Sequence, residues 1–178
     1  MLSVELEPIF WHPMSSNRNW TEWCALLKET ELPLLVVDLE VMKANIKSVL
    51  DAMQSETVAF RLFVPELPCP ALLRLLLLEG SPHVHGLACN TAQEAGLLTE
   101  LGFNDILVLN PVASRAEAHR LATLCQQGHH ILSLVDCEEH LELLSQAALE
   151  LNGTIHICID VDINATSGDS SGSVQPRS

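Results

Sequence analysis

Residues 61–73, RLFVPELPCPALL, place polar and reactive side chains directly after a strand-like run. Pro65, Pro68 and Pro70 interrupt the run, and they predict an extended loop in which Pro70 is the first residue of the following helix. Cys69 lies between two of these prolines, and its thiol could act as a nucleophile if a cation lay beside it. No cation is directly adjacent in the sequence, so we predict no catalytic thiol at this position.

Two further pairs of side chains have a spacing that suits chemistry. His83 and His85 lie two residues apart in a strand-like run, which puts both imidazoles on one face, as in a metal-binding pair. No third ligand follows nearby, so we predict no metal site. Asp160 and Asp162 share a face in the same way, where they could act as a general acid and base or cap the following turn.

The elements that must position these side chains alternate along the chain from residue 32 onward. Apolar runs predict strands at residues 32–39, 58–64, 83–89, 105–110, 131–136 and 155–162. Helical periodicity predicts helices at residues 41–54, 70–79, 92–101, 115–127 and 137–151. Strands this apolar, joined through helices, need cover on both faces, so we expect a parallel sheet in an α/β fold.

The junctions between these elements support the same division. Three of them have the spacing of a capping box: Thr91 with Glu94, Ser114 with Glu117, and Asp136 with Glu139. Glycines follow the predicted helices at Gly80, Gly102, Gly128 and Gly153, where they would end a helix.

Two architectures fit this order of elements: a partial (β/α)8 barrel and an open doubly wound parallel sheet. No strand is followed by G-x-G-x-x-G or G-x-x-x-x-G-K-[ST], which removes the main support for a nucleotide-binding open sheet. Both architectures gather their chemistry at the carboxyl ends of the strands. On this chain those ends are residues 64–66, 89–91, 110–112, 136–137 and 160–162.

Composition excludes two classes of partner. The chain has 178 residues, enough for one domain with a real core, and its 23 acidic residues against 9 basic ones give a formal charge of −14. This charge repels phosphate backbones, so we expect no nucleic-acid binding. The longest apolar run, residues 71–78, is interrupted by Arg74 and is far shorter than the roughly 20 residues that span a membrane. Six cysteines without a C-x-x-C pair suggest a reducing, cytoplasmic setting.

Three ordered segments resemble a known family. They are LPLLVVDLEVMKANI, CNTAQEAGLLTELGFNDILVLNPV and IDVDI, and the similarity covers about residues 33–163. Each is similar to a segment of the fold-type III pyridoxal-phosphate enzymes of the D-threonine aldolase and D-serine dehydratase group, whose barrel is of the alanine racemase N-terminal type. The resemblance implies that the strands from residue 58 onward are the first five strands of an eight-stranded barrel, and it favours the barrel over the open sheet.

The resemblance also shows where this chain departs from the family. The family's first barrel strand ends R-P-H-V-K-T-H-K-C-P, and its first lysine forms the Schiff base with the cofactor. Arg61, Val64, Cys69 and Pro70 match this pattern, but Pro65 stands at the lysine position. The three lysines of the chain are Lys28, Lys43 and Lys47, and none lies at a predicted strand end.

A second departure concerns the family's G-x-x-R-x-G segment, whose arginine lies near the cofactor. In this chain Thr166 or Ser167 takes its place. The Ser/Gly-rich residues 164–178 follow and are predicted to be disordered. We therefore divide the chain into an N-terminal extension (1–31), an incomplete barrel domain (32–163) and this tail. The family layout assigns strand 32–39 to a C-terminal domain that, like the last barrel strands, is not in this sequence.

These departures favour a non-catalytic relative or a shortened form of the family. We expect no catalytic residue, no metal and no bound cofactor, although the resemblance implies pyridoxal phosphate. Four residues at the expected barrel mouth are candidates for contacting a cofactor: Arg61, Thr91, Asn110 and Asp162. The alternative is a pyridoxal-phosphate lyase, an aldolase or dehydratase of β-hydroxy D-amino acids, seen as a shortened form. An incomplete barrel exposes apolar surface, so we expect the isolated chain to be marginally stable, a homo-oligomer, or a shortened product whose full-length form completes the barrel. The sequence names no small-molecule substrate.

Overall fold

The computed structural model describes residues 19–31, 33, 35–53, 58–163 and 174–175. Internal contacts divide the chain into two units, residues 1–54 and residues 55–178. We call the second the sheet-bearing unit. The predicted boundaries at residues 31 and 163 do not coincide with this division and remain predictions.

The first unit contains two helices, α1 (Trp20–Leu27) and α2 (Leu39–Ala52). Asn19 caps α1 in a reciprocal capping box with Glu22. The Asp38 carboxylate caps α2 by accepting hydrogen bonds from the backbone N–H groups of Glu40 and Val41. Neither helix buries a side chain completely, so neither has a core of its own.

The predicted strand at residues 32–39 is wrong in its described part. Residues 33 and 35–38 form no strand, and Leu39 begins α2 instead. The apolar run suggested a strand, but the described part of this unit offers no second strand to pair with it, and the Asp38 cap starts a helix. Leu35 is 91% exposed as a result. Leu32 and Leu34 lie outside the described residues.

The sheet-bearing unit has five parallel strands in chain order: β1 (Phe60–Phe63), β2 (Val84–Cys89), β3 (Asp105–Val108), β4 (His130–Val135) and β5 (His156–Ile159). This order confirms the prediction for residues 58–162. A doubly wound sheet would show a reversal of strand order, and none occurs among these strands. The arrangement is an arc of a (β/α)8 barrel.

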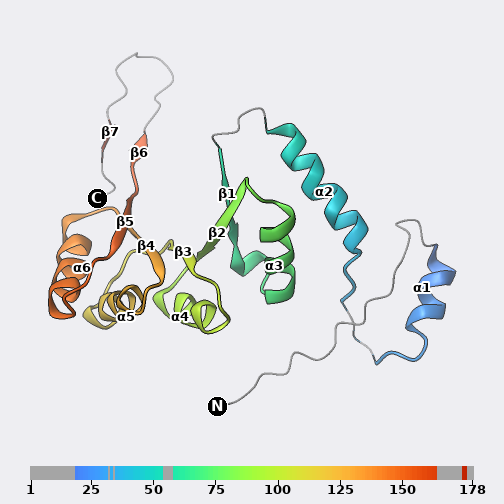
Figure 1. Cartoon of the computed structure of the whole chain (residues 1–178), viewed down its shortest axis with the longest axis horizontal. Coiled ribbons are helices and arrows are strands. Elements are labelled where there is room, and N and C mark those ends of the chain that lie inside the picture. Colours follow the sequence, from blue (N-terminus) through green and yellow to red (C-terminus); the bar gives the residue numbers. More distant parts are fainter. Residues whose placement is uncertain (1–18, 32, 34, 54–57, 164–173, 176–178) are drawn as a thin grey trace. The chain divides into compact units, whose positions relative to one another are not determined.

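Four helices follow the strands: α3 (Pro70–Glu79), α4 (Ala92–Glu100), α5 (Arg115–Gln126) and α6 (Glu138–Glu150). They lie along one face of the sheet, as in the outer layer of a barrel (Figure 1). The core lies between them and the strands, where Leu87, Ile106, Leu121 and Ile131 are at most 1% exposed. The sequence placed every one of these elements to within a few residues.

No helix in the described residues of the sheet-bearing unit covers the opposite face of the sheet (Figure 1). Because side chains alternate along a strand, the neighbours of the buried residues point to this face. One row in register consists of Phe63, Ala88, Leu107, Leu132 and His156. In a closed barrel this face would be the interior.

The predicted helix caps are confirmed in part. Thr91 and Glu94 form a complete capping box, and Ser114 accepts from the backbone N–H of Glu117. The prediction for Asp136 is wrong, because Cys137 is the N-cap residue of α6 and Asp136 does not cap the helix. Among the predicted glycine stops, Gly102 and Gly128 adopt positive φ, whereas Asn152 rather than Gly153 does so after α6.

β5 forms one edge of the arc, and the side chains that would face a further helix remain uncovered. Ile157 is 41% exposed and Ile159 is 65% exposed. Beyond β5, β6 (Asp162–Ile163) pairs with β7 (Val174–Gln175) in a short antiparallel ladder. The tail predicted to be disordered thus contains a strand at residues 174–175, and the rest of it lies outside the described residues. No helix in the described ranges has the length and apolar character that crossing a bilayer requires.

Candidate functional site

The carboxyl end of β1 carries the proline-rich segment. η1 (Val64–Glu66), one turn of 3-10 helix, follows β1 directly and has Pro65 in its first turn. Pro70 is the first residue of α3, as predicted, and Cys69 is the N-cap of that helix. This strand end offers the carboxylate of Glu66 and the thiol of Cys69, but no amine.

At the carboxyl end of β2, the polar groups serve the fold. Burial, with a contribution from the Glu94 carboxylate, raises the pKa of the Cys89 thiol to about 12. This thiol therefore stays protonated and is no nucleophile. The hydroxyl of Thr91 accepts a hydrogen bond of 3.2 Å from the backbone N–H of Glu94. Thr91, one of the candidates for cofactor contact, thus uses its side chain as a helix cap.

The ends of β2 and β3 remain side by side beyond the ladder itself. The backbone N–H of Leu109 donates to Cys89 O at 2.8 Å, and that of Asn110 donates to Asn90 O at 3.0 Å. The structure therefore brings Thr91 and Asn110, two of the four candidates, to neighbouring strand ends.

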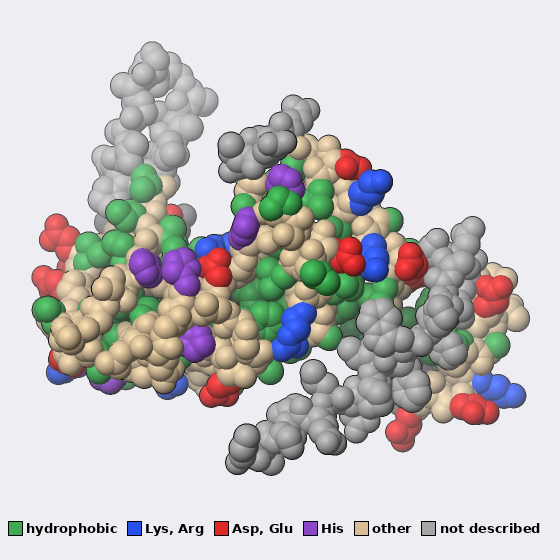
Figure 2. Space-filling model, viewed as in Figure 1, with side chains coloured by type: hydrophobic (Ala, Val, Ile, Leu, Met, Phe, Trp, Pro, Cys, Tyr) green, Lys and Arg blue, Asp and Glu red, His purple; other side chains and the backbone are tan. Residues whose placement is uncertain are grey.

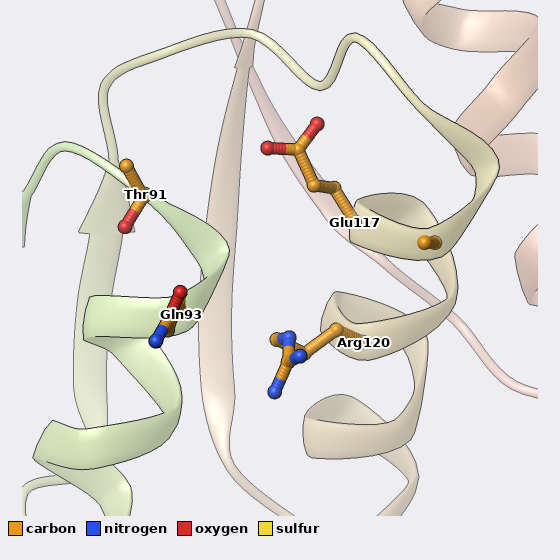
Figure 3. A pocket seen from close by; sticks show the side chains of 5 residues that line it. Thr91, Gln93, Glu117 and Arg120 are labelled. Carbon is orange, nitrogen blue, oxygen red and sulfur yellow. The ribbon is translucent and has the colours of Figure 1, made fainter.

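A cavity of about 200 Å³ lies between the first turns of α4 and α5 (Figure 3). Its lining residues are Thr91, Gln93, Ala116, Glu117 and Arg120. Glu117 and Arg120 extend from α5 toward α4, so the cavity combines one carboxylate and one guanidinium. Glu117 also accepts a hydrogen bond from the backbone N–H of Ala113 at 3.0 Å, which commits this carboxylate to the start of α5.

The carboxyl end of β4 brings three potential metal ligands together. Nδ1 of His140, on the first turn of α6, lies 2.8 Å from Oδ1 of Asp136 and 3.2 Å from Sγ of Cys137. The backbone N–H of His140 acts to lower the pKa of the Cys137 thiol, but desolvation and the Glu139 carboxylate outweigh it, so this pKa is raised. The thiol is therefore not activated as a nucleophile by its surroundings.

Sequence reasoning missed this group. It assigned Asp136 to a capping box and left Cys137 and His140 without a role. The available signal was the spacing D-C-x-x-H at a strand-to-helix junction, because one helical turn returns His140 to the strand end. His83 and His85, the pair considered instead, belong to no group of three or more His, Cys, Asp or Glu side chains in the described part of the chain that could hold a metal.

Arg61 does not lie at the carboxyl ends. Its Nη1 lies 2.8 Å from Oδ1 of Asp105, the first residue of β3, and the same oxygen lies 3.0 Å from Nδ1 of His130, the first residue of β4. The rings of His130 and His156 are 5.0 Å apart. Histidine, acidic and basic side chains gather in this way on the face seen in Figure 2. These residues form a polar cluster at the amino ends of the strands, which corrects the barrel-mouth placement of Arg61.

The last candidates follow β5. The backbone N–H of Asp160 donates to Val135 O at 2.8 Å, so Asp160 lies beside the end of β4. Asp162 begins β6, and its side chain lies outside what the structure describes. The proposed pairing of Asp160 and Asp162 as general acid and base therefore stays a prediction, as does cofactor contact by Arg61, Thr91, Asn110 and Asp162.

Comparison with known proteins identifies relatives whose matched region includes all five strands of the sheet. The family model for the alanine racemase N-terminal domain matches residues 37–168. The D-threonine aldolase of Arthrobacter sp. is 27% identical over 137 residues, covering 77% of this chain and 35% of the relative. The 3-hydroxy-D-aspartate aldolase of Paracoccus denitrificans is 28% identical over 138 residues, with the same coverage.

Solved structures show the same fold. D-threonine aldolase from Filomicrobium marinum superposes with a TM-score of 0.67 at 24% identity, covering 79% of this chain and 37% of that structure. D-threo-3-hydroxyaspartate dehydratase from Delftia sp. HT23 gives 0.67 at 22% identity, covering 82% and 37%. The chain thus spans little more than a third of the length of the relatives it matches.

Proposed function

Because the chain belongs to the alanine racemase N-terminal domain family, we propose that it is a non-catalytic relative of the family's pyridoxal-phosphate enzymes. The observation that carries this proposal is that residues 55–178 contain no lysine. Without a primary amine at a strand end, the sheet-bearing unit cannot hold the cofactor covalently as the resemblance implies.

The other residues present do not fit the cofactor either. Pro65 occupies the position of the family lysine, and it lacks even a backbone N–H. Phe63 stands where the family pattern has histidine, and it is 36% exposed at the end of β1. Arg61, the cation of this strand, is paired with Asp105 at the other end of the sheet. We therefore assign this chain no reaction step that needs pyridoxal phosphate.

A labelling experiment tests the proposal. The full chain is mixed with pyridoxal phosphate, reduced with borohydride and mapped by peptide mass spectrometry, with the Arthrobacter D-threonine aldolase as the positive control. We expect the relative to be labelled stoichiometrically at one lysine and this chain to be labelled weakly over Lys28, Lys43 and Lys47. Stoichiometric labelling of a single lysine, abolished by Lys43→Arg or Lys47→Arg, would overturn the proposal.

The names of the relatives favour a second candidate function, a lyase acting on hydroxy D-amino acids. This candidate requires a longer protein, because the chain covers about a third of each relative. Incubation of the chain with pyridoxal phosphate and either D-threonine or 3-hydroxy-D-aspartate tests whether this part alone is active. Glycine or a 2-oxo acid formed above the rate without protein would support the lyase and overturn the non-catalytic proposal. If no product forms, the lyase candidate is confined to a longer form.

We propose that the non-catalytic role is one of assembly with a second copy of the chain. The exposed Ile157 and Ile159 on the edge strand β5 support this, since such an edge can pair with another strand. Light scattering after size-exclusion chromatography should give the mass of a dimer or larger. Ile159→Lys, which places a charge on the edge, should shift the mass toward the monomer. A wild-type monomer with a sharp cooperative melt would contradict the assembly role.

A further inference from the structure

We propose that Asp136, Cys137 and His140 form a binding site for Zn²⁺ at the carboxyl end of β4. The three side chains offer one carboxylate oxygen, one sulfur and one ring nitrogen, which all lie within 4.8 Å of one another. Within the described residues, this is the only group of at least three His, Cys, Asp and Glu side chains gathered so closely. The inference is independent of the proposed function, because it needs neither pyridoxal phosphate nor a lysine.

The types of donor atom select the metal. A thiolate and an imidazole are typical ligands of Zn²⁺, whereas Mg²⁺ and Ca²⁺ require oxygen donors. A carboxylate completes a set of three protein ligands. Zinc sites with three protein ligands leave the fourth tetrahedral position open for water or another small ligand. Asp136, Cys137 and His140 thus make the kind of site that binds a small molecule, and the sheet places it where barrels carry their chemistry.

The observed distances need only a small adjustment. For tetrahedral Zn²⁺, with bonds of about 2.0 to 2.3 Å, two ligand atoms lie about 3.4 to 3.6 Å apart. The distances from His140 Nδ1 are 2.8 Å to Asp136 Oδ1 and 3.2 Å to Cys137 Sγ. The first distance must therefore open by roughly 0.6 to 0.8 Å and the second by roughly 0.2 to 0.4 Å. The side chains of His140 and Asp136 are 21% and 24% exposed, so both have room to rotate and the ion can enter from solvent.

The direction of the Asp136 side chain also supports the site. Its spacing from Glu139 suits a helix cap, but in the structure its carboxylate meets His140 instead, and no side chain caps the start of α6. The Asp136 carboxylate and the Cys137 thiol both contact Nδ1 of His140, so the three ligand atoms lie around one point. A metal ion at that point would replace both contacts with bonds to itself.

Cys69 provides a matched control for Cys137. Both are half-buried cysteines, both are N-cap residues of a helix that follows a strand, and neither makes a side-chain cap. They differ in their surroundings, because Leu72 stands three residues after Cys69 where His140 stands three residues after Cys137. A cysteine that binds metal only because it is accessible would behave alike at both positions.

Cobalt titration tests the site. The full chain, reduced and freed of metal with EDTA, is titrated with Co²⁺, whose thiolate bond gives a near-ultraviolet charge-transfer band and whose tetrahedral complexes absorb strongly in the visible. We expect a band that saturates at one Co²⁺ per chain and is displaced by Zn²⁺. Cys137→Ser should abolish the thiolate band, and Cys69→Ser should leave it unchanged. His140→Gln, which keeps the thiol, should weaken Co²⁺ affinity at least tenfold.

Circular dichroism of each variant separates loss of the site from loss of the fold. The proposal is overturned if wild type shows no saturable band, if the band survives in folded Cys137→Ser, or if Cys69→Ser reduces it equally. It is also overturned if folded His140→Gln binds Co²⁺ as tightly as wild type. Because pyridoxyl labelling is measured separately, failure of the metal site would leave the proposed function untouched, and the reverse also holds.

Discussion

The two ends of the sheet carry polar clusters of opposite character. At the amino ends, Arg61, Asp105 and His130 join three strands through one carboxylate, and their partners are far apart in sequence. At the carboxyl ends, Asp136, Cys137 and His140 come from a single strand-to-helix junction. The first cluster can hold strands together, whereas the second is local and holds no distant elements.

This difference matches the division of labour in barrel folds, where the carboxyl ends carry function and the amino ends carry stability. The position of Pro65 sharpens the contrast. The carboxyl end of β1, where the resemblance implies the family's lysine, holds a proline in a 3-10 turn, and the end of β4 holds three side chains of metal-ligand type. We expect substitutions in the amino-end cluster to lower stability, and substitutions at the end of β4 to change binding alone. The largest losses of stability should therefore occur at the amino ends, and the smallest at the end of β4.

Gly86→Ala should produce the largest loss. Gly86 has φ of +65° in β2, opposite the register shift between Phe60 and Leu62 of β1. An added Cβ would overlap Arg61 Nη1 and would lie 2.6 Å from the backbone oxygen of Asp105. The strained φ and the backbone clash should lower the free energy of unfolding by about 3 kcal/mol, measured by urea denaturation.

Gly96→Ala is the matched control for this change. Gly96 lies inside α4, and a Cβ there would meet nothing within 4 Å. Alanine is the better helix former, so this variant should be more stable than wild type by about 1 kcal/mol. If both variants had the same effect, the amino-end cluster would not depend on close approach of the β2 backbone.

Asp105→Asn should have the next largest effect. The substitution keeps the shape of the side chain but removes the charge that holds Arg61 at 2.8 Å and His130 at 3.0 Å. Because the Asp105 side chain is 36% exposed, solvent screens the pair, and we expect a loss of about 1 kcal/mol in urea denaturation. The exposed pair of Arg115 and Glu150 is the control, and Glu150→Gln should cost close to nothing.

The same carboxylate should make stability depend on pH. Desolvation acts to raise the pKa of Asp105, but the hydrogen bonds and charges of Arg61 and His130 outweigh it and hold the pKa below its ordinary value of 3.8. Because the pKa of Asp105 is lower in the folded state, its ionised carboxylate stabilises the protein at pH values above the ordinary pKa. This stabilisation is lost as the pH falls through the pKa of the folded state. Between wild type and Asp105→Asn, the difference in unfolding free energy should therefore shrink below about pH 4. A difference that stays constant down to pH 2 would mean that ionisation of Asp105 is not the cause.

The contrast between the two ends of the sheet also explains how much of the structure could be predicted from the sequence. Periodicity predicted β1 to β5 and α3 to α6, because each is a local pattern of apolar residues. It failed at residues 35–38, where the described part of this unit holds no strand to pair with the apolar run and Asp38 caps a helix that begins at Leu39. The pair of Arg61 and Asp105 lies 44 residues apart, so only the register of three strands brings it together. The cluster at the end of β4 could have been predicted, since D-C-x-x-H is a local pattern. It was missed because the spacing of Asp136 from Glu139 suggested a capping box instead.

The smallest effect is expected at the end of β4. In the presence of EDTA, Cys137→Ser and His140→Gln should each change the free energy of unfolding by no more than about 0.5 kcal/mol, because the half-buried partners can turn to water. With Zn²⁺ at 100 times its dissociation constant, wild type should gain about 2.7 kcal/mol and Cys137→Ser should gain almost nothing. Urea denaturation with and without Zn²⁺ measures both values. A loss above about 1.5 kcal/mol for either variant in EDTA would mean that this cluster supports the fold as the amino-end cluster does, and the contrast between the two ends would not hold.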